Sequence, residues 1–171
     1  MKDVKIALIY GSTTGNTEDV AEKIQENLAG HEVQLFDVAD ASPAEACVFD
    51  RIIMGIPTWD YGEIQSEWED VWEDLDELEL NGKRIALFGL GDQIGYGDWF
   101  LDAMGKLHDK LVEAGAEMVG YWPNEGYDFS ASVALTPDGK QFVGLALDED
   151  CQSELTDERV SKWCKQVLAE F

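Results

Sequence analysis

The sequence Tyr10-Gly11-Ser12-Thr13-Thr14-Gly15-Asn16-Thr17 stands between an apolar run and the start of a helical pattern. Such a turn points backbone N–H groups and hydroxyls at one anion-sized position, and the positive end of the helix dipole adds to the attraction for an anion. The turn contains no Lys or Arg, whereas nucleotide loops need a Lys for the β- and γ-phosphates. A plain structural turn is the alternative, but the place of this turn after the first strand favours a site for one terminal phosphate.

The composition is that of one folded domain with an unusual charge. The chain has 171 residues, of which 45% are hydrophobic, so it can bury a core, and we expect a single domain over residues 1–171. Asp and Glu number 36 against 12 Lys and Arg, for a formal net charge of -24. This charge repels nucleic acids and anionic membranes and favours basic protein partners, although high acidity can also serve solubility alone.

No metal site, membrane segment or export signal is predicted. Cys47, Cys151 and Cys164 are scattered and form no ligand spacing, so we interpret them as reduced, mostly packing residues. His31 and His108 have no Cys or His neighbours at ligand spacing, which favours surface or helix-packing roles over metal binding. No stretch approaches the ~20 apolar residues that a membrane-spanning helix requires. The N-terminal apolar run is short and has no basic n-region or cleavage site, so we expect a cytoplasmic protein.

Apolar runs alternate with helical patterns along the chain. This alternation predicts right-handed crossovers and a doubly wound α/β sheet with helices on both faces, which places ligands at the carboxyl ends of the strands. The predicted strands cover residues 4–10, 32–36, 51–55, 84–89 and 117–122, and the predicted helices cover residues 18–28, 66–78, 98–113 and 157–169.

The segment from residue 123 to residue 139 departs from this alternation. Pro123, Gly126, Pro137 and Gly139 interrupt a stretch without helical period before residues 142–147 become apolar again. We interpret the segment as an insertion that splits the fifth strand.

The predicted helix 66–78 has one apolar and one acidic side. Trp68, Val71, Trp72 and Leu75 recur at i, i+3, i+4 and i+7, while carboxylates occupy most other positions. We therefore expect Trp68 and Trp72 to pack inward rather than to contact a ligand.

Two aromatic loops follow the third and fourth strands. Residues 55–63 read GIPTWDYGE and place Trp59 and Tyr61 at the ligand edge of the sheet, and residues 89–98 read GLGDQIGYGD and add Tyr96. A dinucleotide fingerprint should follow the first strand, and here the third Gly of the second loop is one place late, so we reject that reading. Each aromatic alone is more often a packing residue, but together at one edge they could clamp a flat ring.

These motifs resemble those of the flavodoxin family. The resemblance rests on GSTTGNT at 11–17, PTWDYGE at 57–63 and GLGDQIGYGDWF at 89–100, and it covers essentially the whole chain. The segments YWPNEGYDF and FVGLALDEDCQ resemble the long-chain subclass, and PTWDYGEIQ and WFLDAMGKLHDKL resemble the second flavodoxin paralogue of enteric bacteria. The resemblance implies a five-stranded parallel sheet of order 2-1-3-4-5 in three layers, with the fifth strand split by the insertion.

The resemblance also implies a function. It predicts a low-potential carrier that holds FMN non-covalently, passes electrons one at a time and transforms no substrate itself. Expected partners are basic-faced redox proteins, namely reductase-type donors and acceptor enzymes, with the carrier itself a monomer. The implied cofactor-binding residues are Ser12, Thr13, Thr14, Gly15, Asn16 and Thr17 at the phosphate, Trp59 and Tyr96 on the two ring faces, Asp92 at the pyrimidine edge, Asp148 at the ribityl chain, and Pro57, Thr58, Asp60, Tyr61, Gly62, Leu90, Gly91 and Trp99 in the loops.

The loops contain one departure from better-known family members and one peptide that bears on the redox behaviour of the flavin. Trp99 and Leu101 replace residues that are often polar, so hydrogen bonds there are expected from the backbone. In the family a loop peptide turns its carbonyl toward the flavin N5–H, and by position this is the Asp60–Tyr61 peptide. Neither residue is Gly, so we predict that Asp60→Gly eases this turn and stabilises the one-electron-reduced form.

Two other functions deserve comparison with the carrier. A flavodoxin-like NAD(P)H:quinone oxidoreductase needs open space over the ring for hydride transfer, which Tyr96 would obstruct. A phospho-acceptor receiver domain requires acidic residues after the first strand and an Asp at the end of the third, where this chain has residues 10–12 (YGS) and 55–57 (GIP). The sequence therefore favours the carrier and nearly excludes the receiver domain.

Overall fold

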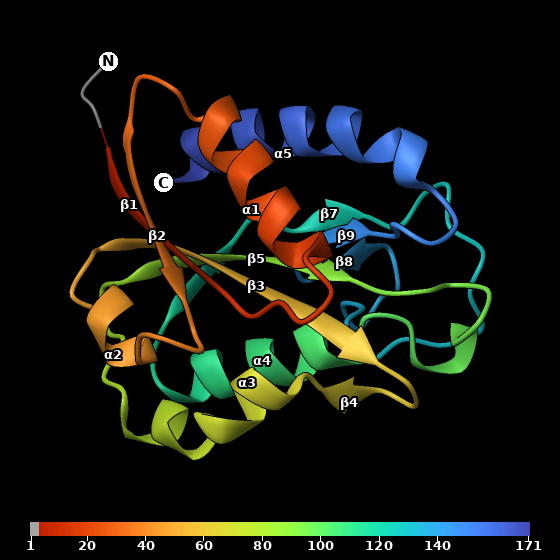
Figure 1. The fold of residues 1–171 in the computed structure, drawn as a ribbon, viewed down its shortest axis with the longest axis horizontal. Coiled ribbons are helices and arrows are strands. Elements are labelled where there is room, and N and C mark those ends of the chain that lie inside the picture. Colours follow the sequence, from red (N-terminus) through yellow and green to blue (C-terminus); the bar gives the residue numbers. More distant parts are fainter. Residues whose placement is uncertain (1–3) are drawn as a thin grey trace.

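The computed structural model describes residues 4–171 and has a parallel sheet at its centre (Figure 1). Its strand order is β2-β1-β3-β5-β6, which is the predicted order 2-1-3-4-5 once the small additional strand β4 is left out of the numbering. The five strands are β1 (Lys5–Tyr10), β2 (Glu32–Asp37), β3 (Arg51–Trp59), β5 (Arg84–Leu90) and β6 (Glu117–Val119).

The fifth position of the sheet is filled by two separate pieces of chain, as predicted. Strand β6 pairs with the first half of β5, from Arg84 to Ala86, and β9 (Leu145–Leu147) pairs in parallel with the second half, from Phe88 to Leu90. Between these pieces the insertion forms an antiparallel pair, β7 (Trp122–Pro123) and β8 (Gln141–Phe142).

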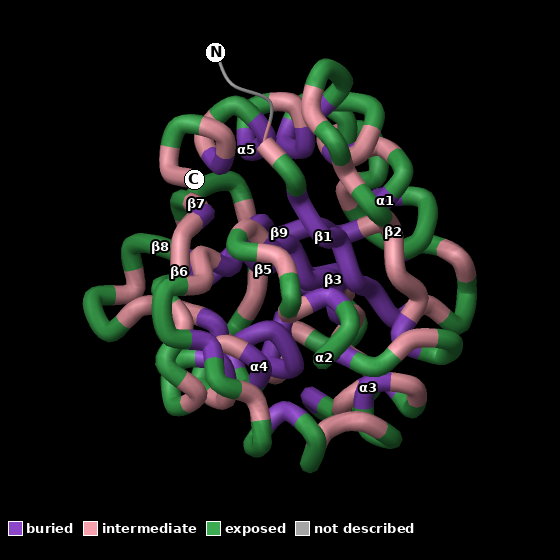
Figure 2. Tube along the Cα trace, turned by 90° about the vertical axis from the view of Figure 1, so that its left-hand side faces the viewer, coloured by how far each residue is buried: buried purple, intermediate pink, exposed green. Residues whose placement is uncertain are grey.

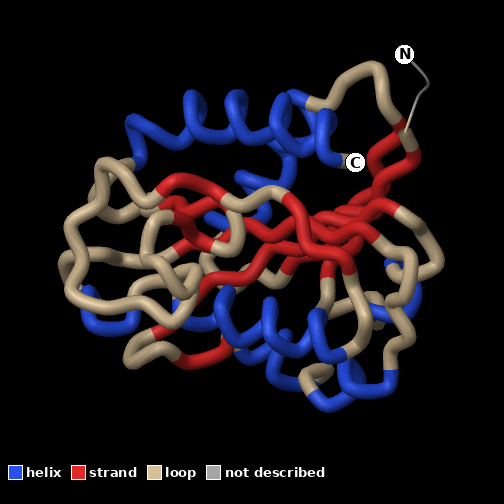
Figure 3. Tube along the Cα trace, turned by 180° about the vertical axis from the view of Figure 1, so that it is seen from behind, coloured by secondary structure: helices blue, strands red, loops and turns tan. Residues whose placement is uncertain are grey.

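Helices cover both faces of the sheet, which confirms the three-layer prediction. One face carries α1 (Asn16–Asn27) and α5 (Thr156–Glu170), and the other carries α2 (Pro43–Ala46), α3 (Ser66–Asp70) and α4 (Asp102–Glu113), as Figures 1 and 3 show. Within residues 4–171 no helix has the length and apolar character needed to cross a membrane.

Two cores lie on opposite faces of the sheet because successive residues of a strand point to opposite sides. In β1, Ala7 and Ile9 belong to the core that includes buried residues of α2 and α4, while Ile6 and Leu8 belong to the core that includes buried residues of α1 and α5, and all four are fully buried. Figure 2 shows β1 and β3 as buried strands between the two helical layers. A strand buried on both faces reads as an almost continuous apolar run, which is why the sequence indicated these strands clearly.

The predicted helix 66–78 is shorter in the structure. Helix α3 ends at Asp70, and a separate 3₁₀ helix covers Glu73–Glu77. Like charges repel at the spacings that an α-helix brings together, and this segment contains seven carboxylates within 67–77. Trp68 and Leu75 are fully buried and Trp72 is half-buried against the same core, so the expected inward packing is confirmed.

The predicted helix 98–113 begins later than expected. A 3₁₀ turn covers Gly97–Trp99, and α4 starts only at Asp102 because Phe100 is extended and Leu101 adopts a left-handed conformation with φ 59°. Phe100 and Leu101 are almost completely buried, so their tertiary packing overrides the helical pattern of the sequence. The short elements α2 and β4 (Glu63–Ile64) were not predicted.

Candidate functional site

The turn after β1 has the geometry of an anion site. Gly15 is left-handed, with φ 94°, and its N–H donates to Ser12 Oγ at 3.1 Å. Helix α1 starts at Asn16, and its first backbone bond runs from Asp19 N to the Gly15 carbonyl at 3.0 Å. The N–H groups at the start of a helix have no carbonyl four residues earlier to bind, so they remain available to a ligand.

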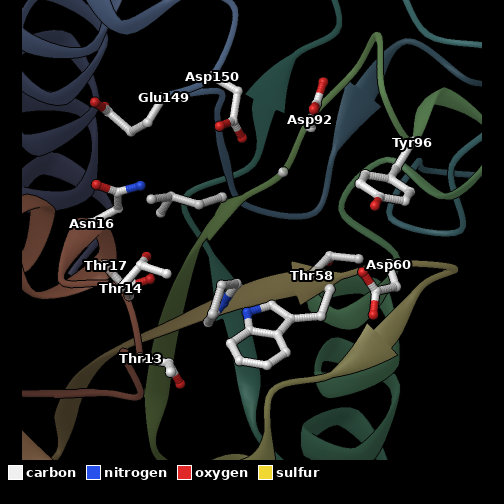
Figure 4. A pocket seen from close by; sticks show the side chains of 14 residues that line it. Thr13, Thr14, Asn16, Thr17, Thr58, Asp60, Asp92, Tyr96, Glu149 and Asp150 are labelled. Atoms are coloured by element: carbon white, nitrogen blue, oxygen red, sulfur yellow. The ribbon is translucent and has the colours of Figure 1, made fainter.

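This turn opens into a cavity of about 350 Å³ at the carboxyl edge of the sheet. Figure 4 shows the side chains of Thr13, Thr14 and Thr17 at one end of the cavity and Tyr96 at the other. No Lys or Arg is among the lining residues. The lining residues are Thr13, Thr14, Asn16, Thr17, Pro57, Thr58, Trp59, Asp60, Leu90, Gly91, Asp92, Tyr96, Glu149 and Asp150.

Six residues of the predicted binding set are absent from this lining. Ser12 and Gly15 shape the turn through their mutual hydrogen bond. Tyr61, Gly62 and Trp99 belong to the loops beside the cavity, and Asp148 is fully buried next to the lining residues Glu149 and Asp150 in the chain. The cavity therefore brings together residues from all three predicted loops, and the remaining predicted residues support those loops.

Contacts from helix α4 hold the end of β3, which continues through Trp59 rather than ending at residue 55 as predicted, and the short loop after it. The Ala103 N–H donates to Thr58 Oγ1 at 3.0 Å, and Lys106 Nζ donates to the Gly62 carbonyl at 2.7 Å. Gly62 has φ 82°, and a Cβ at this position would lie 2.9 Å from a carboxylate oxygen of Asp102, so only glycine fits here. The loop is thus fixed at both ends around Asp60 and Tyr61.

Asp60 is strained at the centre of this loop. Its φ is 43°, in the left-handed region that costs an L-residue ~1 kcal/mol or more relative to glycine. Stabilising the one-electron-reduced form by ~1 kcal/mol raises the first potential and lowers the second by about 43 mV each, so we expect Asp60→Gly to widen the gap between the two one-electron potentials of the FMN-bound protein by up to about 90 mV. Stepwise redox titration measures this gap. Asp60→Asn, which removes the charge and keeps a side chain, is the control, and a gap that stays the same or narrows in Asp60→Gly contradicts the expectation.

The aromatic residues of the two loops contact one another. Tyr61 packs edge-on against Trp99 with ring centroids 4.9 Å apart, and against Tyr96 at 6.1 Å. Tyr61 is 66% exposed, so it covers the outer side of this cluster. Trp59 and Tyr96 both line the cavity, as a pair of ring platforms would require, while Tyr61 contacts Tyr96 and Trp99 from outside the lining.

The loop after β5 is shaped by its own carboxylate. Asp92 Oδ1 accepts the N–H groups of Ile94 at 3.1 Å and Gly95 at 2.7 Å. A Cβ at position 95 would lie 2.5 Å from Asp92 Oδ2, so glycine is needed for this turn. Asp92 lines the cavity and also fixes the path of the chain toward Tyr96.

Asp148 differs from its expected role at the ribityl chain. It is fully buried, and its carboxylate accepts the N–H groups of Gln93 at 3.0 Å, Asp150 at 3.0 Å and Cys151 at 2.9 Å. These bonds join the loop after β5 to the loop after β9. The next two residues, Glu149 and Asp150, line the cavity in its place.

The acidic wall of the cavity perturbs Asp150. Loss of hydration raises the pKa of its carboxyl group above the usual value, and the charges of Asp92, Asp148 and Glu149 raise it further. A raised pKa in the folded state means that the folded protein holds the proton more tightly than the unfolded chain does. The stability that this proton contributes is present at low pH and is lost as the pH rises above the usual carboxyl range.

Asp150→Asn is therefore expected to stabilise the apoprotein at pH 7, by less than ~1 kcal/mol because the group is exposed. The gain should shrink as the pH falls toward 3.8, the ordinary value from which this pKa is raised. Urea unfolding at several pH values measures it. Asp138→Asn is the matched control, since backbone N–H donation lowers the pKa of that exposed carboxyl and the substitution should not stabilise. An Asp150→Asn variant less stable than the parent at pH 7 would contradict this account.

The cysteines differ in exposure more than expected. Cys164 is buried and Cys47 is half-buried, and burial raises their pKa values to about 12 and about 11. Cys151 is exposed, which corrects the expectation of a packing residue for this one, and its thiol lies 3.4 Å from Asp92 Oδ1. Loss of hydration, the bond to Asp92 and the charge of Asp148 raise its pKa to about 11, so the reactive thiolate is disfavoured.

Three residues of the site were missed by the sequence analysis. Glu149 and Asp150 directly follow Asp148, and their position after a short apolar strand was an available signal. Gln65 is fully buried and donates from Nε2 to Thr13 Oγ1 at 2.9 Å. An uncharged amide just before an acidic helical segment has no periodicity that marks it, so only the structure could reveal this contact.

Comparison with known proteins finds matches to flavodoxins in both sequence and structure. The model of the flavodoxin family matches residues 8–163. Flavodoxin 2 of Salmonella typhi is 54% identical over 168 residues, which cover 98% of this chain and 97% of that protein. Flavodoxin 2 of Escherichia coli K12 is 53% identical with the same coverage.

The structure leads to the same family. The flavodoxin of Fusobacterium nucleatum, solved bound to flavin mononucleotide, has a TM-score of 0.93 at 29% identity, covering 98% of this chain and 99% of that one. Three observations point to the same family. They are the strand order, the split fifth strand and the match to the flavodoxin model along most of the chain. The chain belongs to the flavodoxin family.

Proposed function

We propose that this chain binds FMN non-covalently in the cavity beside β1, β3 and β5 and carries electrons one at a time between redox proteins. The observation that carries this proposal is the cavity itself, which joins a helix start without Lys or Arg in its lining to two aromatic side chains. It holds the two features that a flavin mononucleotide needs, a phosphate cradle and a flat aromatic slot.

The chemistry of the lining residues fits FMN. The first turn of α1 and the hydroxyls of Thr13, Thr14 and Thr17 supply donors for the terminal phosphate. Trp59 and Tyr96 bind the ring on its two faces, and their aromatic surfaces keep water away from it. When bound, FMN supplies the reversible one-electron chemistry that the protein side chains lack.

The charge of the protein makes this cofactor harder to reduce. Asp60, Asp92, Glu149 and Asp150 line the cavity, and no cation is among the lining residues. A carboxylate ~10 Å from the flavin in a water-like dielectric disfavours added negative charge by about 0.4 kcal/mol, or roughly 17 mV for one electron. Several such carboxylates together lower the potential appreciably, which suits a low-potential carrier.

The loops also favour a carrier over an enzyme. Tyr96 stands at the end of the cavity opposite the phosphate turn, with Tyr61 against it at 6.1 Å, so a nicotinamide would have to displace an aromatic cluster to reach the ring. A quinone oxidoreductase would need that space open. The protein itself therefore performs electron transfer and no substrate chemistry.

The same carboxylates favour basic-faced partners. With a net charge of -24, the chain attracts a reductase or acceptor whose contact surface is positive, and this attraction raises the rate of encounter. Since surface charges are screened over ~8 Å at physiological ionic strength, electron transfer from such a partner should slow as salt is added. We propose that the carrier works in the cytoplasm as a monomer.

Reconstitution of the apoprotein tests the function. Added FMN is expected to bind one to one and to lose its fluorescence as the ring stacks. NADPH alone should not reduce the bound flavin at a useful rate, whereas NADPH with a catalytic amount of a flavin-containing reductase should. Failure to take up FMN, or rapid oxidation of NADPH by the protein and a quinone alone, would overturn the proposal.

A further inference from the structure

We propose that Gln65 is a positioning residue for the phosphate of FMN, acting through the hydroxyl of Thr13; this inference rests on the proposed function. Gln65 lies between β4 and α3 and is fully buried, so it does not line the cavity itself. Thr13 is exposed and does line it. The two side chains meet through the Nε2 to Oγ1 bond of 2.9 Å.

The bonding partners fix the orientation of the Gln65 amide. Its Oε1 accepts the backbone N–H of Trp68 at 3.2 Å, the contact that caps the start of α3. The amide oxygen is therefore committed to a donor, and the NH₂ group must face Thr13. A flipped amide would place NH₂ against N–H and oxygen against oxygen, and it would lose the helix cap.

This orientation determines which way the Thr13 hydroxyl points its proton. A hydroxyl has one proton to donate and can accept at its lone pairs. Because Thr13 Oγ1 accepts from Gln65, its proton remains free to donate into the cavity, where an anionic phosphate oxygen is the strongest acceptor. Gln65 thereby prepares a phosphate donor before the ligand arrives, which lowers the cost of ordering on binding.

The surroundings hold the Gln65 amide in place. A Cβ on Gly11 would lie 2.5 Å from Gln65 Oε1 and 2.7 Å from Trp68 Cδ1, so the turn passes as close to this pair as a glycine allows. The Trp68 indole N–H donates to the Gly55 carbonyl at 2.9 Å, and the Gly11 N–H donates to the same carbonyl at 3.3 Å. The phosphate turn, β3 and α3 are thus joined through one compact network.

Comparison of FMN with riboflavin separates positioning from ordinary packing. Riboflavin has the same ring and ribityl chain but no phosphate. If Gln65 acts through Thr13 on the phosphate, Gln65→Met should weaken FMN about 10- to 100-fold, the range for a hydrogen bond to a charged group, and should change riboflavin affinity less than about threefold. Equal losses for both ligands, or no loss for either, would overturn the inference.

A double-mutant cycle sharpens the test. Thr13→Val removes the hydroxyl and Thr13→Ser retains it, so Gln65→Met should cost FMN affinity little in the Val background and its full amount in the Ser background. If Gln65→Met lowers FMN affinity as much in the Thr13→Val background as in the Thr13→Ser background, Gln65 does not act through the Thr13 hydroxyl. Gln166→Met is the matched control, since Gln166 also donates a side-chain amide bond, to the Tyr121 carbonyl at 2.7 Å, and should show no preference for FMN.

The test remains decisive if Gln65→Met folds poorly. Gln65→Asn keeps an amide that is one methylene too short to span both partners, and it should show the same selective loss of FMN affinity. Riboflavin binding by each variant reports whether the rest of the site is intact. A wild-type protein that binds no FMN would refute the proposed function. If the wild type binds FMN but the Gln65 variants lose FMN and riboflavin affinity equally, only this inference is refuted.

Discussion

Riboflavin is expected to bind the apoprotein about 1,000-fold or more weakly than FMN. The phosphate meets the free N–H groups at the start of α1 and the hydroxyls of Thr13, Thr14 and Thr17. A hydrogen bond to a charged group contributes ~1.5–3 kcal/mol, so three of them amount to at least ~4 kcal/mol, or about three powers of ten in affinity. Titration calorimetry of the apoprotein with each ligand measures the ratio.

The salt dependence of FMN binding provides an internal control. A phosphate site built on Lys or Arg weakens as salt screens the attraction, but this cavity has neither residue in its lining. The net charge of -24 instead repels the phosphate, so added salt should strengthen FMN binding and leave riboflavin nearly unaffected. Comparable affinities for the two flavins, or FMN binding that weakens steeply with salt, would contradict a cradle made of backbone and hydroxyl groups.

Trp68→Ala is expected to destabilise the apoprotein by about 3–5 kcal/mol, the usual cost of truncating a buried Trp or Phe. Trp68 is fully buried, and its indole N–H donates to the Gly55 carbonyl at 2.9 Å. The variant loses both the packing and that bond, beside the Gln65 amide that supports the phosphate turn. Since a domain of this kind is stable by only ~5–15 kcal/mol, the midpoint of urea unfolding should fall markedly.

Trp72 is the matched control for this substitution. It lies four residues further along the same segment, is half-buried, and faces the ammonium of Lys110 at 5.5 Å from the ring centroid. Trp72→Ala should cost clearly less than Trp68→Ala, and saturating FMN should raise the stability of both variants above that of their apoproteins, since a ligand of the folded state stabilises it. Equal losses for the two Trp residues would show that burial and the indole bond do not determine the effect.

The sequence was most informative where burial imposes a simple pattern. Strands β1, β3 and β5 are covered on both faces, so each reads as an apolar run, and the glycines and prolines of the insertion mark where the fifth strand is interrupted. The loops at the carboxyl edge follow from the strand order, which explains why most predicted site residues line one cavity.

Tertiary contacts decided the features that were missed. Helical periodicity in residues 98–113 did not show that Leu101 turns left-handed to reach the core, and the pattern in residues 66–78 did not show where carboxylate repulsion divides the helix. The motif around Asp148 marked the right loop, but the sequence alone does not show that its buried carboxylate accepts hydrogen bonds from three backbone N–H groups. Side chains bonded to distant backbone carry no local pattern.

Stepwise potentiometric titration of the FMN-bound protein tests the central claim, that an acidic protein without a cation in its flavin cavity holds FMN as a one-electron carrier. We predict two separated one-electron steps, with the second lying below the corresponding step of free FMN because negative charge is added beside Asp60, Asp92, Glu149 and Asp150. A single two-electron step at or above the potential of free FMN would contradict the account.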